Sequence, residues 1–215
     1  MKLLRRLLLP CLLLPLLTPA TAHAAPAPLG GGSPLSTPTS YRCVASFAAT
    51  GNKTGYLITS PRCGRPGETV HSNRVLVGVV AAAPIPPVNA SVVRVTNTTD
   101  WKLVGRIPPG NPRITGSTEA PVGASVCMLG PVSGWHCGTI QAKNQTVNFP
   151  EGTLHGLTRT TVCAEPGDAG APFFSGEQAQ GVLVGGSGNC ASGGTSYFQP
   201  INKILAVYGL TLLTG

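Results

Sequence analysis

Charged and aromatic residues are scarce in this sequence. Of its 215 residues, 10% are Asp, Glu, Lys or Arg and 5% are Phe, Trp or Tyr. The basic residues are scattered singly, whereas a nucleic-acid-binding surface needs a basic stripe interleaved with aromatic side chains. We therefore expect no nucleic-acid partner. The modest excess of positive charge leaves acidic cell-surface polymers open as weak, salt-sensitive partners.

Long apolar runs are absent after the first 24 residues, so no membrane span is expected. Those residues carry a basic start, the apolar run "LLLPCLLLPLL" and the small-residue site "AHA", which together are typical of a secretory signal peptide. The run is too short and too broken by proline to span a bilayer. We predict a signal peptide over 1–24 and a secreted, extracellular mature protein. Removing three basic residues and no acidic one lowers the formal net charge from +8 to +5.

Helical periodicity is also rare. Residues 25–40, "APAPLGGGSPLSTPTS", resemble a Pro/Gly/Ser linker with nothing to bury. Beyond them, short Val/Thr/Leu/Ala runs separated by Gly, Pro and Asn indicate strands. These runs are 41–49, 55–60, 74–82, 91–96, 124–129, 137–142, 154–162, 171–174, 179–186 and 195–198. Only 199–210, "QPINKILAVYGL", shows helical spacing, with Ile201, Ile204, Leu205 and Tyr208 on one face. The pattern predicts an all-β fold of one large or two small barrels, with a candidate seam at "IPPGNP", 107–112.

Six cysteines remain after the predicted signal peptide. An even number in an exported chain indicates disulfides, and six cysteines allow 15 connectivities, of which sequential pairing is the simplest. These cysteines are Cys43, Cys63, Cys127, Cys137, Cys163 and Cys190. A zinc site formed by Cys127, His136 and Cys137 is the alternative, although its spacing matches no familiar zinc pattern. We expect no metal and no cofactor.

Residues 154–210, and the stretch "SGWHCGTIQAKN" at 133–144, resemble the streptogrisin and α-lytic protease branch of the chymotrypsin-like serine peptidases. The stretches "YRCVASF", "GYLITSPRC" and "NASVVRVTNTT" fall where the early strands of that family fall, so the resemblance extends over 41–215. It implies two six-stranded antiparallel β-barrels packed face to face, over 41–111 and 112–215, with a short C-terminal helix and a cleft between the barrels. It also implies the disulfides Cys43–Cys63, Cys127–Cys137 and Cys163–Cys190.

The same resemblance places three substitutions at the catalytic positions. The family uses a histidine as base, an aspartate to stabilise the imidazolium and a serine as nucleophile. The histidine position in "TSPRC" is Arg62, the aspartate position before "VVRV" is Asn89, and the serine position in "GDAGAP" is Ala169. An engineered inactivation would change one of these residues and leave the others, so a natural loss of the catalytic triad is indicated.

Parts of the substrate-binding machinery are retained. The resemblance assigns the oxyanion-hole N–H groups to Gly167 and Ala169, and the peptide-binding strand to Val184, Gly185 and Gly186. Asp168 is expected to be buried. Met128 occupies the position of the arginine that pairs with this carboxylate in the branch, so backbone N–H groups or another basic side chain are expected as its partners.

These observations predict a secreted, monomeric homologue of the serine peptidases that has lost proteolytic activity and binds an extended peptide or protein in the cleft. Two alternatives stay open. One is an active endopeptidase that uses Ser60, Ser175 or Ser187 as nucleophile, and the other is a structural exported domain without a ligand in the groove. Of the histidines after the predicted signal peptide, we expect His71 on a loop, His136 in a structural role and His155 on a strand, none of them catalytic.

Overall fold

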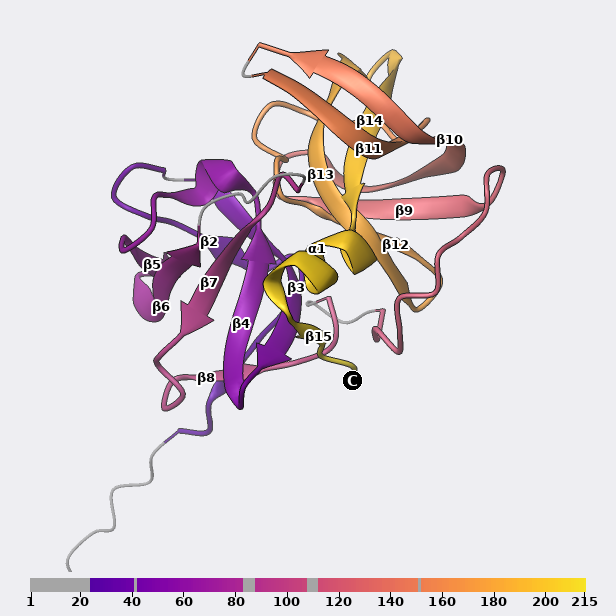
Figure 1. Ribbon diagram of the computed structural model, residues 1–215. Helices are drawn as coiled ribbons and strands as arrows, with labels where there is room; N and C mark the ends of the chain where they lie inside the picture. The colour runs from indigo at the N-terminus through magenta and orange to yellow at the C-terminus, as the bar shows by residue number, and fades with distance from the viewer. Residues whose placement is uncertain (1–23, 41, 83–87, 108–111, 151) are drawn as a thin grey trace, which may run out of the picture.

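Two β-sheets, one from each half of the chain, dominate the computed structural model, which describes residues 24–40, 42–82, 88–107, 112–150 and 152–215 (Figure 1). The strands are β1 (Ala27–Leu29), β2 (Pro34–Leu35), β3 (Cys43–Gly51), β4 (Thr54–Thr59), β5 (Thr69–Ser72), β6 (Val75–Ala82), β7 (Ser91–Val95), β8 (Trp101–Leu103), β9 (Ser125–Gly130), β10 (Gly134–Phe149), β11 (Gly152–Thr160), β12 (Pro172–Ser175), β13 (Gln178–Asn189), β14 (Gly193–Pro200) and β15 (Thr211–Leu212). A 3-10 turn, η1 (Pro61–Cys63), and one α-helix, α1 (Ile201–Tyr208), complete the elements. Each of the ten runs predicted as strands overlaps one of these strands.

The first half forms a seven-stranded antiparallel sheet in the order β15-β3-β4-β7-β6-β5, with β2 also paired to β3. Alternate residues of these strands point into a core that contains Leu57, Val77, Val93 and Trp101. Strand β15 comes from the end of the chain and β2 from before residue 41, and both pair with β3, so two of the seven strands lie outside the range 41–111 predicted for the first barrel.

The second half is a closed barrel of six strands in the order β10-β11-β14-β13-β12-β9. Its core includes Met128, Phe173 and Phe198, and the rings of the two phenylalanines stack with centroids 4.8 Å apart. The all-β double-barrel prediction is thereby confirmed.

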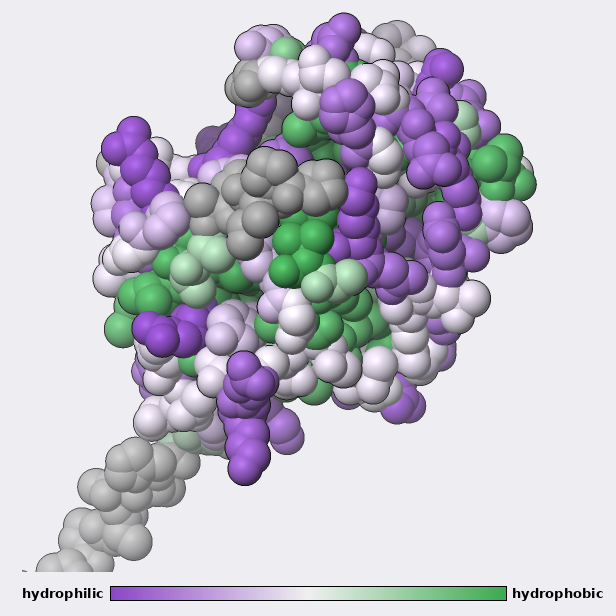
Figure 2. Space-filling view, viewed as in Figure 1, coloured by the Kyte–Doolittle hydropathy of each residue, from purple (hydrophilic) through white to green (hydrophobic). Residues whose placement is uncertain are grey.

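A third apolar cluster joins the two sheets. It combines Phe47 and Ile58 of the first sheet with Phe174 of the second and with Ile201 and Ile204 of α1. The predicted helix is confirmed, and its apolar face is buried between the two halves, where Figure 1 shows α1. Apolar side chains also gather on the surface of this region (Figure 2). Burial of this shared cluster makes the two halves depend on each other for stability.

The segment 25–40 is not the linker that its composition suggested. Strand β1 pairs in parallel with β8, β2 pairs with β3, and the side chains of Leu29 and Leu35 are buried in the core of the first sheet. The glycines between them suit close contact, because a Cβ on Gly31 would lie 2.3 Å from the carbonyl oxygen of Ser46. The segment is therefore part of the folded first half: β2 extends the seven-stranded sheet, and β1 forms a separate two-stranded sheet with β8.

Three disulfides fasten the loops, and their pairing is the one implied by the resemblance: Cys43–Cys63, Cys127–Cys137 and Cys163–Cys190. The Cys127–Cys137 bridge contradicts the alternative zinc site, because a cysteine in a disulfide has no thiolate to give a metal. Some predictions fall on residues outside the described ranges. These are nearly all of the signal peptide at 1–24, most of the seam at 107–112, and parts of the first-barrel range 41–111, including Tyr41. No helix in the described ranges is long and apolar enough to cross a membrane.

Candidate functional site

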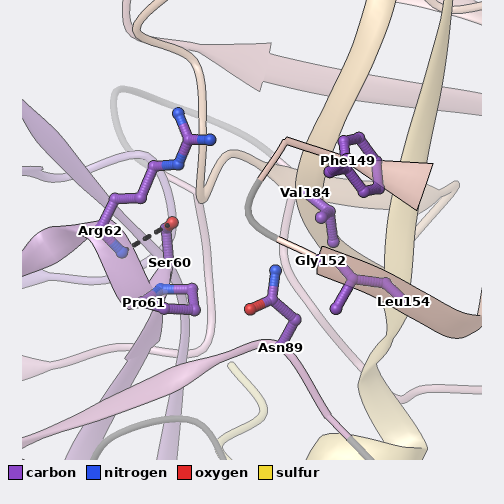
Figure 3. Close-up of a pocket in the computed structure, with 8 residues that line it drawn as sticks. All are labelled: Ser60, Pro61, Arg62, Asn89, Phe149, Gly152, Leu154 and Val184. Atoms are coloured by element: carbon purple, nitrogen blue, oxygen red, sulfur yellow. Dashed lines mark hydrogen bonds between the residues drawn. The ribbon is translucent and has the colours of Figure 1, made fainter. Parts of the chain in front are cut away.

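Two adjoining cavities open in the cleft between the two halves. The smaller, called here the Asn89 cavity, has a volume of about 190 Å³ and is lined by Ser60, Arg62, Asn89 and Val184 among others (Figure 3). The larger, called the Ala169 cavity, has a volume of about 270 Å³. Arg62, Phe149 and Val184 line both cavities, so the two share a wall. The structure thus brings Arg62, Asn89 and Ala169 to one cleft.

Arg62 is held by the local structure of η1. Ser60 precedes this turn, and its Oγ accepts a hydrogen bond from the backbone N–H of Arg62 at 3.2 Å. Pro61 supplies a fixed φ at the start of the turn, and Cys63 ends it with a disulfide to β3. The backbone of Arg62 is therefore fixed, while its exposed side chain extends along the wall of the cleft (Figure 3).

Asn89 enters the cleft from the segment before β7. Its backbone N–H donates to the side-chain Oε1 of Gln199 at 3.3 Å, and Gln199 is fully buried in β14 of the second barrel. This bond ties the first half of the chain to the second at the floor of the cleft. The side-chain amide of Asn89 points into the Asn89 cavity (Figure 3).

The turn that carries Ala169 is organised around the carboxylate of Asp168, which is fully buried. Oδ1 accepts from the backbone N–H groups of Val132, at 2.9 Å, and Ser133, at 3.1 Å, and Oδ2 accepts from the N–H of Glu165 at 2.8 Å. Three hydrogen bonds to an ionised group compensate for its removal from water. Backbone N–H groups, which the sequence analysis named among the possible partners, hold this carboxylate.

Two N–H groups of the same turn have no acceptor among the described residues. Gly170 donates its N–H to the carbonyl of Leu183, and Ala171 donates to the carbonyl of Asp168. Within the described part of the chain, the N–H groups of Gly167 and Ala169 make no hydrogen bond, and both residues line the Ala169 cavity. Gly167 has φ +109°, a conformation that glycine adopts easily and other residues rarely do. The turn therefore leaves two donors available to a ligand.

One edge of strand β13 is open along the Ala169 cavity. Strand β12 pairs with β13 only as far as Val182, whereas β14 pairs with it up to Asn189. Beyond Leu183, whose N–H donates to Ala171, the edge of β13 that faces away from β14 has no partner strand among the described residues. Such an edge offers backbone donors and acceptors to an extended chain.

None of the described histidines lines either cavity. His136 Nε2 lies 2.9 Å from the carbonyl oxygen of Ser133, and His155 Nδ1 lies 3.0 Å from Thr146 Oγ1. His71 is in strand β5 rather than on the expected loop, because its backbone pairs opposite Leu76 of β6; it also forms an isolated bridge with Ser36 of the N-terminal segment. His136 lies near the sulfur atoms of Cys163 and Cys190, but these two cysteines form a disulfide.

Among the described residues, none of the serines considered as alternative nucleophiles is hydrogen-bonded to a histidine. Ser60 Oγ, which is buried, accepts from the N–H of Arg62. Ser175 Oγ donates to the carbonyl of Ser125 at 2.7 Å, away from the cavities. Ser187 lies on β13 and lines neither cavity. No histidine–serine pair of the kind needed for acyl transfer is present among the residues described.

Residues of the β10–β11 hairpin also shape the cleft, and the sequence analysis did not identify them. Phe149 lines both cavities, and Gly152 and Leu154 line the Asn89 cavity. A Cβ on Gly185 would lie 2.9 Å from the Phe149 ring, so this ring covers the glycine strand. The stretch "VNFPEG" reads as an ordinary strand end and turn, and nothing in it indicates that the hairpin bends over the cleft.

Comparison with known proteins agrees with this architecture. A family model described as Trypsin matches residues 70–207. Streptogrisin-C of Streptomyces griseus is 49% identical over 176 residues, which are 81% of this chain and 38% of that protein. Streptogrisin-A of the same organism is 33% identical over 189 residues, 86% of this chain and 61% of that protein. The chain thus spans between about a third and two thirds of the length of these relatives.

Solved structures show the same likeness over most of the chain. Protease A of Thermobifida fusca superposes with a TM-score of 0.79 at 43% identity, covering 88% of this chain and 100% of that one. A chymotrypsin of Cellulomonas bogoriensis gives 0.78 at 43% identity, with 88% and 100% covered. The fold and cleft define a serine peptidase scaffold of the chymotrypsin type. The chain belongs to the trypsin family, in its streptogrisin branch.

Proposed function

We propose that this chain is a member of the trypsin family that does not hydrolyse peptides and instead binds them in the cleft. The observation that carries the proposal is that Arg62 and Ala169 line one cavity, at the positions where the family's sequence motifs place the histidine and the serine. Asn89, at the position of the aspartate, lines the adjoining cavity.

Each substitution removes a different part of the chemistry. Alanine has no nucleophile to attack a carbonyl carbon. Arginine stays protonated at any working pH and takes no proton from a serine or a water molecule. Asparagine carries no charge to stabilise an imidazolium. Val184, at a position where the branch has a serine that binds the aspartate, fits the loss of that carboxylate.

Loss of the complete triad removes a factor of about 10⁶ from turnover in the worked serine-protease case. The purified chain should therefore show no turnover of casein or of chromogenic peptide esters. An active-site-directed fluorophosphonate should leave every serine unlabelled, as read by intact-protein mass spectrometry. Stoichiometric labelling of Ser60, Ser175 or Ser187 would establish an active peptidase and overturn the proposal.

Peptide binding is supported by the open edge of β13 beside the Ala169 cavity. An extended peptide that adds to this edge gains main-chain hydrogen bonds, which need no nucleophile. Gly185 and Gly186 line the cavity beside this edge, and the absence of side chains lets the Phe149 ring and strand β14 pack closely against the strand.

Binding through the backbone has a direct test on the unaltered protein. A fluorescein-labelled tetrapeptide with an apolar last residue should bind in fluorescence anisotropy. Its twin, N-methylated at the amide that would pair with β13, should bind at least about tenfold more weakly, because a hydrogen bond to the strand is lost and the methyl group keeps the chains apart. Equal affinities of the twins would contradict strand addition. Absence of binding by both would favour a structural domain without a groove ligand.

Export of the chain is the second part of the proposal. Three disulfides persist in oxidising surroundings and are uncommon in the cytosol of mesophiles, which supports secretion. Amino-terminal sequencing of the protein from culture supernatant should find residues 1–24 removed. Recovery of the chain only from the cytosol, with its cysteines reduced, would refute export.

A further inference from the structure

We propose that His136, Cys163 and Cys190 provide a zinc site when the disulfide between the two cysteines is reduced, a role independent of the proposed peptide binding. The ligand atoms of the three side chains lie within 4.8 Å of one another. In the described part of the chain, they are the one group of three His, Cys, Asp or Glu side chains that lie so close together. Thiolate and imidazole are the ligands that structural zinc sites use.

Three segments that are distant in the sequence supply these ligands. His136 lies on β10, Cys163 follows β11, and Cys190 directly follows the last residue of β13. The segment before Cys163 is held beside β10, because the N–H of Thr161 donates to the carbonyl of Thr139 at 3.0 Å. The group is therefore a product of the fold rather than of a local motif, and for this reason no zinc-binding spacing is visible in the sequence.

The hydrogen bond of the imidazole leaves a suitable nitrogen for a metal. His136 Nε2 lies 2.9 Å from the carbonyl oxygen of Ser133, and because a carbonyl only accepts, Nε2 carries the proton. In the neutral ring Nδ1 then has a lone pair, and no donor among the described residues is hydrogen-bonded to it. Metal-binding histidines usually donate their other ring N–H in this way, which fixes the tautomer and the orientation of the ring.

This site differs from the zinc site considered in the sequence analysis, which used Cys127 and Cys137. His136 and Cys137 are consecutive on a strand, so their side chains point to opposite faces of the sheet. The Cys127–Cys137 disulfide joins paired residues of β9 and β10. The imidazole is thus turned away from its neighbour in sequence and lies beside the Cys163–Cys190 pair.

Zinc binding requires that the disulfide is opened first. A dithiol opens it by exchange: the dithiol becomes a disulfide, and two electrons and two protons pass to Cys163 and Cys190. One Zn²⁺ then replaces the two thiol protons, which pass to water, and accepts the Nδ1 lone pair as its third bond. Water completes the four-coordinate shell. Cys163 is buried, but His136 and Cys190 are partly exposed, so that reductant and ion reach the pair from solvent.

The ion would take over the structural role of the disulfide. Residues 164–167 follow Cys163 and residues 184–188 precede Cys190, and both stretches contribute to the wall of the Ala169 cavity. Besides the disulfide, the N–H of Cys190 joins the two stretches by donating to Glu165 Oε1 at 2.8 Å. A zinc ion held by both cysteines therefore keeps the two walls of the cavity together in reducing surroundings, where the disulfide does not persist.

Protection of the cysteines by zinc tests this inference on the complete mature chain. The chain is reduced with a phosphine, which takes its oxygen from water and brings no thiol to compete for zinc. It is then treated with iodoacetamide with and without equimolar ZnCl₂, and each cysteine is followed by peptide mass spectrometry. Zinc should slow alkylation of Cys163 and Cys190 at least about tenfold, because the electron pair of each thiolate is bound to the metal. The cysteines of the other two disulfides should react equally fast in both samples.

A pair of histidine variants shows whether the imidazole is a ligand. His136→Gln keeps a donor for the carbonyl of Ser133 but has no ring nitrogen, and it should abolish the protection. His155→Gln is the matched control, because His155 is an exposed histidine of β11 outside the group, with Nδ1 bonded to Thr146. Protection of all six cysteines alike, or protection that survives His136→Gln, would overturn the site.

A second measurement needs no reductant and decides the question if reduction unfolds the chain. Cys190→Asp cannot form the disulfide, offers zinc an oxygen ligand in place of sulfur, and leaves the other two disulfides intact. Against a chromophoric chelator, it should bind Zn²⁺ at least about tenfold more tightly than Cys190→Ala, since loss of even an outer partner weakens metal binding by about 10–100-fold. Adding His136→Gln should remove this difference. Equal zinc affinities of Cys190→Asp and Cys190→Ala would refute the inference.

Discussion

Replacing the buried carboxylate of Asp168 by an amide should destabilise the whole chain. In Asp168→Asn, one side-chain oxygen replaces two, and the new NH₂ group faces the N–H of Glu165 or the N–H groups of Val132 and Ser133. At least one buried donor then loses its acceptor, at a cost of about 1–3 kcal/mol, and the bonds that remain lose their charge assistance, at about 1 kcal/mol each. Relief from burying a charge offsets part of this cost.

The expected net loss is about 2–4 kcal/mol of the free energy of unfolding, measured in urea with the disulfides intact. With a slope of about 2 kcal/mol per molar urea, the midpoint should fall by roughly 1–2 M. Asp100→Asn is the matched control: the carboxylate of Asp100 is exposed and accepts from the Asn97 side chain at 2.7 Å, so its loss should stay within about 0.5 kcal/mol. If Asp168→Asn unfolds at the same urea concentration as the control, the carboxylate does not organise the turn and the reasoning is wrong.

Three further predictions concern the N-terminal segment, the second barrel and the missing triad. Leu29→Ala should lower the free energy of unfolding by about 2–5 kcal/mol in the same urea assay, because Leu29 is fully buried, whereas Pro28→Ala should have little effect, because Pro28 is exposed. Equal, negligible effects of the two substitutions would restore the linker interpretation. Phe173→Ala should cost about 3–5 kcal/mol, because it empties the barrel core beside Phe198. Ala169→Ser alone should not hydrolyse a peptide ester, and Arg62→His with Ala169→Ser should give a trace. Adding Asn89→Asp should restore measurable turnover. The gain should exceed the sum of the effects of the single substitutions, since a triad lacking its aspartate loses about 10⁴ in rate. Ester hydrolysis by Ala169→Ser at the rate of an ordinary protease would reveal an unrecognised base.

The strands of both barrels could be predicted because their patterns are local. Runs such as 74–82 and 179–186 contain β-branched residues between turn-forming ones, and α1 shows its buried face as Ile201, Ile204 and Leu205. The hydrogen bonding of Asp168 in the turn at 163–172 could also be predicted, because a buried carboxylate needs donors and residue 128 is methionine rather than the arginine of the branch.

Pairings between distant segments could not be predicted in this way. Strand β1 is stabilised by β8, and the Gly- and Pro-rich composition of the surrounding segment, 25–40, gives no sign of that pairing. The bend of the β10–β11 hairpin that brings Phe149 over the cleft depends on register shifts along the two strands, which no residue pattern indicated. Such features follow from tertiary contacts, and local propensity carries little information about them.

The last residues of the chain fasten the two halves by adding strand β15 to the first sheet. Thr211 and Leu212 leave the second barrel and pair with Thr50 and Ala49 of β3, and the N–H of Gly215 donates to the carbonyl of Ile114. A nick in the connection at 115–124 would sever the backbone without separating the pieces, because the first fragment lacks an edge strand that the second fragment carries. Produced apart, the first fragment would have a sheet without its edge strand β15, and the second would have its complete six-stranded barrel but carry β15 unpaired. Mixing the two fragments would restore the pairing of β15 with β3 by complementation.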